Sequence, residues 1–239
     1  MFEQRIGKKE FLRDPFEAAT EVLLGSYLCS TIGGKLTAGR ITELEVYIGA
    51  EDKACHAYLN RKTPRNAAMF ETGGCAYVFF VYGMYNQFNV VLNEAGTANA
   101  ALVRGLEPIA GIETMQERRG TDRLDNLTTG PGKLCQALGI GREQNGVDLG
   151  GDLLWLSPRD RDFAWAATPR IGIDYAEEYV EKPWRFVIKG SPFVSKMPKK
   201  GKKKKCLPLL PLFYVRCFMP YQTLLTRICR TMCFESCRR

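Results

Sequence analysis

A strictly alternating segment near residue 45 constrains the fold of this chain more than any other feature. Residues 42–48 read Thr-Glu-Leu-Glu-Val-Tyr-Ile, so two sets of side chains alternate along the segment. This period of two predicts a half-buried β-strand. The second set is Glu43, Glu45 and Tyr47, which would all project from one face. A loop follows and carries His56, the only histidine of the chain.

The next segment has the pattern of a β-hairpin. Residues 77–81 are aromatic and β-branched, as strands prefer, and residues 86–92 would form the return strand. The turn between them reads Tyr-Gly-Met-Tyr, and Gly83 can adopt the positive φ that tight turns require. Tyr82 would therefore stand at an exposed tip, where a large aromatic side chain adds little stability and suggests a function.

Helix and strand signals along the rest of the chain do not alternate regularly. Residues 14–17 read Asp-Pro-Phe-Glu, a typical helix start, and apolar side chains then recur at helical spacing as far as Tyr27. We expect helices at 112–119 and 133–138, strands at 100–104, 152–156 and 184–188, a strand-closing segment at 105–108 and a mobile loop at 120–130. This irregular order predicts an α+β domain with an antiparallel sheet rather than a parallel α/β fold.

The charge of the chain is unevenly distributed. The formal net charge is +8, but residues 196–239 hold 12 of the 34 basic and one of the 26 acidic side chains. Residues 1–195 keep 22 basic and 25 acidic side chains, a formal charge of −3. Any surface that binds nucleic acid must therefore be local, and the global charge is no argument for it.

Composition also excludes some classes of protein. Met1–Arg13 is charged throughout and does not read as a signal peptide, and the chain has no run of 18 apolar residues, so we expect no membrane-spanning helix. Cys29, Cys55, Cys75 and Cys135 have spacings that fit neither a zinc site nor a disulfide framework, which indicates reduced thiols.

Residues 196–239 form a tail rich in lysine and cysteine. We expect it to be disordered or a non-native extension, such as a translated frameshift or read-through. A DNA-binding or membrane-surface tail is an alternative. Cys229, Cys233 and Cys237 are four residues apart and could share a helix face, but three thiols without a fourth ligand are weak evidence for a metal site.

Several motifs together resemble the alkyladenine (3-methyladenine) DNA glycosylases. ELEVYIG, a histidine nine residues after its tyrosine, TPRN, YGMY and LVRGLEP occur in the family's order, followed by GPGKLCQALGI and RIGIDYAEEYVEKPWRFVIKGSPFVS. The resemblance covers about residues 4–195, and it is the shared order that makes it specific. We therefore expect one glycosylase domain of residues 1–195: a curved antiparallel sheet flanked by helices, with the hairpin protruding.

The resemblance implies a DNA repair enzyme that removes alkylated or deaminated purines. Such an enzyme must first flip the nucleotide out of the duplex. It then hydrolyses the N-glycosidic bond and leaves an abasic site. Glu45, which shares a strand face with Tyr47, would be the general base that activates the attacking water and stabilises positive charge on the sugar.

The resemblance also implies the other site residues. An alkylated purine is flat and often cationic, so aromatic rings can hold it by stacking and cation–π attraction. Tyr82 would enter the minor groove and fill the space that the base leaves. The resemblance further implies that the rings of Tyr47, His56 and Phe79 line the base pocket and that Asn89 excludes guanine. It also implies that Arg104 positions the water and the DNA phosphate, and that the Ile171 carbonyl holds the water. Phe79 stands where the family often has tyrosine, so any hydrogen bond from that hydroxyl is lost.

Two other functions remain open at this point. One is a protein that binds damaged DNA without cutting it, against which the presence of Glu45 argues. The other is a carboxylate hydrolase of small substrates, which has no use for Tyr82. The pocket motifs contain no lysine that could form a Schiff base, so we expect hydrolysis without strand cleavage, no metal and no other cofactor. We further expect a monomer that acts on double-stranded DNA inside the cell.

Overall fold

The computed structural model describes residues 2–81 and 83–195, which lie in one compact unit. The described helices are α1 (Pro15–Glu17), which continues into a π-helix (Ala18–Leu23), α2 (Ile112–Arg119) and α3 (Pro131–Leu138). The strands are β1 (Tyr27–Ser30), β2 (Thr37–Ile48), β3 (Ala76–Val81), β4 (Tyr85–Leu92), β5 (Asn99–Ala110), β6 (Leu154–Ser157), β7 (Trp165–Thr168) and β8 (Arg185–Ile188). Short 3₁₀ turns occur at Lys8–Leu12, Ile32–Gly34, Tyr58–Asn60, Ala67–Phe70, Leu124–Asn126, Arg142–Gln144 and Glu177–Tyr179.

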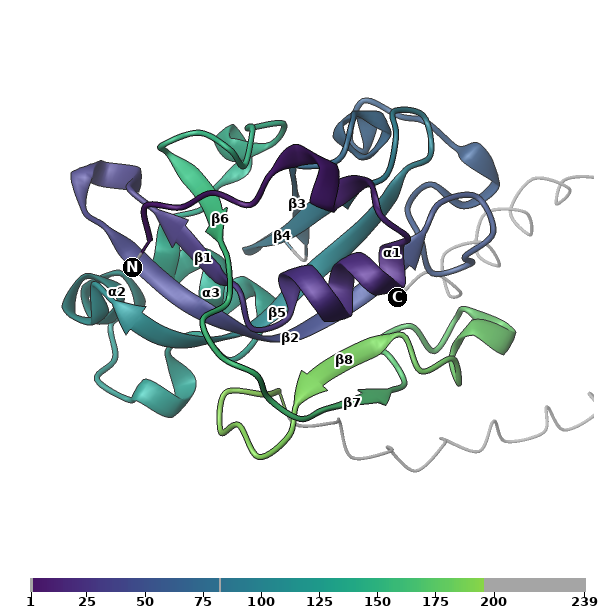
Figure 1. The fold of residues 1–239 in the computed structure, drawn as a ribbon. Helices are drawn as coiled ribbons and strands as arrows, with labels where there is room; N and C mark the ends of the chain where they lie inside the picture. Colours follow the sequence, from purple (N-terminus) through teal and green to yellow (C-terminus); the bar gives the residue numbers. More distant parts are fainter. Residues whose placement is uncertain (1, 82, 196–239) are drawn as a thin grey trace, which may run out of the picture. The chain divides into compact units, whose positions relative to one another are not determined.

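The described strands form one antiparallel sheet in the order β3-β4-β5-β2-β1-β6 (Figure 1). Strand β2 is its centre. One edge of β2 pairs with β5, and the other pairs first with β1, at residues 37–40, and then with β8, at residues 43–45. Register shifts between β2 and β5 mark β-bulges around residue 42, and bulges bend the strands that carry them. The structure confirms the α+β class and the antiparallel sheet.

Burial on both faces of β2 corrects the expectation of a half-buried strand. Leu44 and Val46 are fully buried in the largest apolar cluster, which also contains side chains from α3 and the π-helix. Glu43 and Glu45 on the other face are equally inaccessible to solvent. Loops distant in sequence cover this second face, and a local alternation of side chains cannot reveal them.

The first helix begins as predicted and ends earlier. The Asp14 carboxylate accepts hydrogen bonds from the backbone N–H groups of Phe16 and Glu17, as a helix cap does. The helix stops at Leu23, and Tyr27 belongs to β1 rather than to the helical stripe. Gly25, with φ of 83°, makes the turn between them, because the left-handed conformation interrupts a helix.

The β3–β4 hairpin has the predicted strands and a turn at the predicted place. Val81 pairs with Tyr85, and Gly83 adopts a φ of 67°. Near this tip the side chains of Phe80, Met84 and Tyr85 are exposed. Tyr82 and residues 196–239 lie outside the described residues, so the predicted wedge and the predicted tail remain predictions.

Strand β5 differs most from its prediction. It runs on through the Gly105–Pro108 segment that was expected to close it, and Pro108 pairs with Gly39 next to a register shift. A bulge accommodates proline because a ladder hydrogen bond is already missing there. Strands β1 and β7, each of four residues, were not predicted. Among the described helices, none has the length and apolarity that a bilayer span demands.

Candidate active site

Four adjacent strands bring the candidate residues to one face of the sheet. Tyr77 of β3 pairs with Asn89 of β4, Asn89 pairs with Leu102 of β5, and Leu102 pairs with Glu45 of β2. Side chains that are directly paired, or two residues apart along a strand, lie on the same face of a sheet. Phe79, two residues from Tyr77, therefore joins this row, as do Arg104 and Tyr47 on their own strands.

A cavity of about 350 Å³ lies over this face. Six of the predicted site residues line it: Tyr47, His56, Phe79, Asn89, Arg104 and Ile171. Loops complete its walls, including residues 54–56 after β2 and residues 171–173 before β8. The volume is in the range that protein pockets use for small ligands, and most of the lining is apolar or aromatic.

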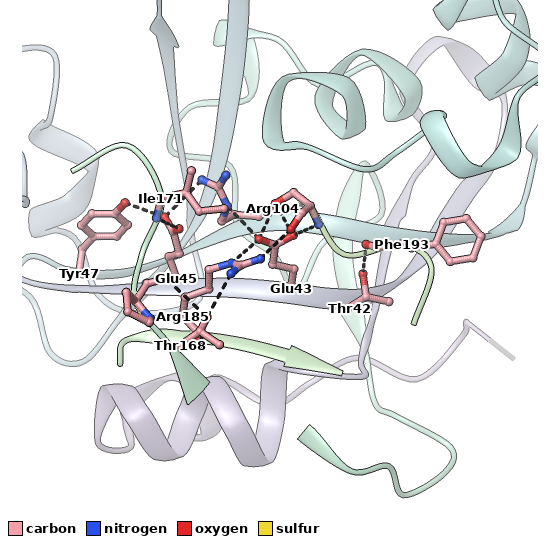
Figure 2. Close-up of polar contacts among 11 residues, drawn as sticks. Thr42, Glu43, Glu45, Tyr47, Arg104, Thr168, Ile171, Arg185 and Phe193 are labelled. Atoms are coloured by element: carbon pink, nitrogen blue, oxygen red, sulfur yellow. Dashed lines mark hydrogen bonds and ion pairs between the residues drawn. The ribbon is translucent and has the colours of Figure 1, made fainter. Parts of the chain in front are cut away.

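Glu45 is buried and is not among the residues that line the cavity, but its contacts are with residues that do. Figure 2 shows these contacts. The Ile171 N–H donates to Oε1 over 2.7 Å, while the Tyr47 hydroxyl and Arg104 Nη1 donate to Oε2 over 2.8 and 3.3 Å. All three donors come from residues that line the cavity. An ionised carboxylate can accept about four hydrogen bonds, so these three donors leave one acceptor position for a further donor such as water.

The contact made by Ile171 differs in kind from the one predicted. Its backbone N–H holds the Glu45 carboxylate, whereas the resemblance implied that its carbonyl holds a water. The role of the carbonyl stays a prediction.

Glu43 is a second buried carboxylate on the same face of β2. Its Oε1 accepts from Arg104 Nε over 3.1 Å and from Arg185 Nε over 2.6 Å. The Ser195 N–H donates to Oε2 over 2.6 Å, and the Ser195 hydroxyl lies within 2.7 Å of both oxygens. Arg104 therefore joins the two glutamates: its Nε contacts Glu43 and its Nη1 contacts Glu45 (Figure 2).

Burial and charge act in opposite directions on this cluster. Burial disfavours the charged form of Arg104, but the neighbouring Glu45 and Glu43 outweigh it and raise the pKa of the guanidinium. Burial, and next the negative charge of Glu45, raise the pKa of Tyr47 well above its ordinary value. The Tyr47 phenol is therefore protonated at neutral pH and donates its hydrogen bond to the carboxylate.

His56 and two aromatic rings form a second wall of the cavity. His56 Nδ1 lies 2.8 Å from the Tyr77 hydroxyl, and the imidazole and the Phe79 ring meet edge to face at a centroid distance of 4.6 Å. Burial, followed by the positive charge of Arg65, lowers the pKa of His56 below 6.5, so the ring is neutral at pH 7. Asn66, from the TPRN motif, donates to the His56 carbonyl and holds the loop in place.

Sequence reasoning missed two residues that hold the site together. Arg170 and Asp52 form a fully buried, bidentate ion pair with N–O distances of 2.6 and 2.9 Å. Their positions differ by 118 residues, so no local pattern connects them. Tyr77 and Gln87, which also line the cavity, could have been found, because they alternate with Phe79 and Asn89 on the two hairpin strands.

The described residues contain no group of three or more His, Cys, Asp or Glu side chains placed to hold a metal ion. The cysteines at 29, 55, 75 and 135 are free thiols. Cys55 lines the cavity, but burial raises its pKa to about 12, so it remains a protonated thiol and a poor nucleophile at neutral pH.

Comparison with known proteins identifies the family. The family model described as methylpurine-DNA glycosylase matches residues 9–192. A protein of Alkaliphilus oremlandii is 42% identical over 198 residues, covering 79% of this chain and 98% of the relative. A protein of Clostridium acetobutylicum is 44% identical, covering 79% and 96%, and one of Bacillus cereus is 46% identical, covering 77% and 95%.

All three relatives carry the printed name "Putative 3-methyladenine DNA glycosylase". The family model and the relatives span nearly the whole described part of the chain, including every strand that contributes to the cavity. On these grounds, the chain belongs to the methylpurine-DNA glycosylase family of base excision repair hydrolases.

Proposed function

We propose that this protein flips alkylated or deaminated purines out of duplex DNA and hydrolyses their N-glycosidic bond with a water that Glu45 activates. The product is an abasic site in an uncut strand. The observation that carries the proposal is the position of Glu45: a carboxylate behind a cavity walled by aromatic rings, with one lone-pair position left for a water.

The aromatic walls suit a flat, electron-poor base. Tyr47, His56 and Phe79 can stack on a purine or meet it edge-on, and their faces attract positive charge. Asn89 lines the cavity and donates to the Tyr77 carbonyl over 3.0 Å, and in the proposed complex it would exclude the 2-amino group of guanine. Phe79 can stack on the base but has no hydroxyl with which to form a hydrogen bond to it.

Water must reach a carboxylate that is closed to solvent in the free protein. The longest of the three contacts to Glu45 is the one with Arg104, at 3.3 Å. We propose that Arg104 turns toward the DNA phosphate when the nucleotide enters and so admits the water. Glu43 would retain the other end of the guanidinium during this movement.

A base-release assay tests the proposal. Duplexes carrying 3-methyladenine analogues, hypoxanthine or ethenoadenine should release free base, and the strand should break only after alkali treatment. Strand cleavage without alkali would contradict hydrolysis by water. Tight binding of these duplexes with no base released from any of them would favour the binding protein instead.

A second test concerns the hairpin. We propose that Tyr82 enters the minor groove and occupies the space of the flipped base, because base–aromatic stacking is worth about 1–3 kcal/mol. Tyr82→Ala should therefore weaken binding of damaged duplex roughly 5- to 150-fold, as that energy converts. Tyr58→Ala is a control, since Tyr58 lies on a different loop. Unchanged activity in Tyr82→Ala would favour a small-substrate hydrolase.

A further inference from the structure

Arg170 is a buried cation held in place from several sides. Its side chain has no exposed surface, its two terminal nitrogens bind the Asp52 carboxylate, and Nη1 also donates to the Val46 carbonyl over 3.0 Å. The next residue, Ile171, donates its N–H to Glu45. The ion pair therefore anchors the loop at residues 170–173 to the loop that follows β2, and the bond to Val46 anchors it to β2 itself.

The guanidinium lies against two aromatic rings. Its central carbon is 4.6 Å from the Tyr47 ring centroid and 5.0 Å from the Trp184 ring centroid. Tyr47 also lines the cavity, whereas Arg170 does not. Tyr47 therefore lines the cavity with a fixed positive charge packed against its ring.

A cation against the ring changes what the ring attracts. An aromatic face draws positive charge through its quadrupole, and the attraction grows when the partners are desolvated. The positive charge of Arg170 repels a second cation at the ring, and the low dielectric of a buried site strengthens that repulsion. A neutral purine experiences no such charge–charge penalty. Asp52 carries the opposite charge and offsets part of the repulsion.

We propose that the Arg170–Asp52 pair sets the preference of the cavity between cationic and neutral purines. The guanidinium lowers the affinity for a cationic alkylated base such as 3-methyladenine, and Asp52 limits that loss. The affinity for neutral bases such as hypoxanthine is then closer to the affinity for cationic ones. This inference depends on the proposed function, because it assumes that a flipped purine occupies the cavity.

Two variants should shift this preference in opposite directions. Asp52→Asn leaves the Arg170 charge uncompensated, so affinity for the cationic lesion should fall about 3- to 10-fold relative to the neutral one. The double variant Asp52→Asn/Arg170→Gln removes both charges and keeps planar, hydrogen-bonding groups, so the same ratio should rise by about 3- to 10-fold. Trp184→Phe keeps the charge and a ring against it, and should leave the ratio unchanged.

The measurement is the dissociation constant for duplexes carrying 3-methyladenine, hypoxanthine or no lesion, in a Glu45→Gln background that prevents turnover. Thermal unfolding identifies which variants are folded. A folded Asp52→Asn variant or a folded double variant is sufficient for the test. The quantity compared is the affinity for the cationic lesion divided by the affinity for the neutral lesion. If this ratio stays within about twofold of the parent's in a folded variant while both affinities fall together, the pair is only structural and the inference is wrong. If the parent binds neither lesion more tightly than undamaged duplex, the proposed function itself fails.

Discussion

Glu45→Gln should abolish base release while duplex binding persists. The substitution keeps the size of the side chain and removes the group that would take a proton from water. Because general-base catalysis contributes about 10²- to 10⁴-fold, the single-turnover rate of excision should fall by at least that factor. The same carboxylate would also stabilise positive charge on the sugar, which adds to the loss. Excision rate and duplex affinity are measured on the same preparation.

The matched control for this variant is Glu51→Gln. Glu51 follows the same strand but is exposed, so its substitution should change neither rate nor affinity. The expected perturbation of Glu45→Gln is local, because Arg104 retains its contact with Glu43 and the amide oxygen can still accept from Ile171. An excision rate equal to that of the unmodified protein would remove Glu45 as the catalytic base.

Local sequence patterns predicted the elements that their own residues determine. The alternation around residue 45 predicted β2, the Asp14 cap began the first helix, and Gly83 marked the hairpin turn. Each of these depends on contacts within a few residues. The motif resemblance then pointed to six residues that the structure places around one cavity.

The same reasoning failed where burial is decided by distant parts of the chain. Nothing near Glu43 shows that Arg185 and Ser195, 142 and 152 residues away, will enclose it. The Arg170–Asp52 pair is invisible for the same reason, because each residue alone is an ordinary charged side chain. The Glu43–Arg185 pair is recognisable only once β2 and β8 are known to pair, and the Arg170–Asp52 pair only once the segments next to these strands are known to meet.

The segment at residues 191–195 supplies the last part of this enclosure. The Phe193 carbonyl accepts from the Thr42 hydroxyl over 2.7 Å, and it lies so close to Gly105 that a Cβ there would be only 2.5 Å away. Ser195 donates to Glu43, and its carbonyl accepts from Arg185 Nη2 over 2.8 Å. The segment is therefore bound to the same ionic cluster that orients Arg104.

The effect of C-terminal truncation on stability should consequently change sharply between residues 190 and 196. A chain of residues 1–196 should fold and excise bases like the full-length protein, whereas a chain of residues 1–190 should be strongly destabilised. The shorter chain removes the Ser195 donors to Glu43 and the Ser195 carbonyl that accepts from Arg185 Nη2, and each buried polar group that loses its partner costs about 1–3 kcal/mol, more if charged. A total of about 3–6 kcal/mol is a large share of the roughly 5–15 kcal/mol that stabilises a domain.

Thermal unfolding measures how much residues 191–195 stabilise the domain and how much of this comes from the Ser195 hydroxyl. For a domain of this size, a loss of about 3–6 kcal/mol corresponds to a Tm lower by roughly 6–24 °C. Ser195→Ala within residues 1–196 removes the hydroxyl and keeps the backbone N–H, so its Tm should lie between those of the two truncated chains. Equal stability of the two truncated chains would show that residues 191–195 do not support the cluster. Unfolding of residues 1–196 would instead place the domain boundary further along the chain.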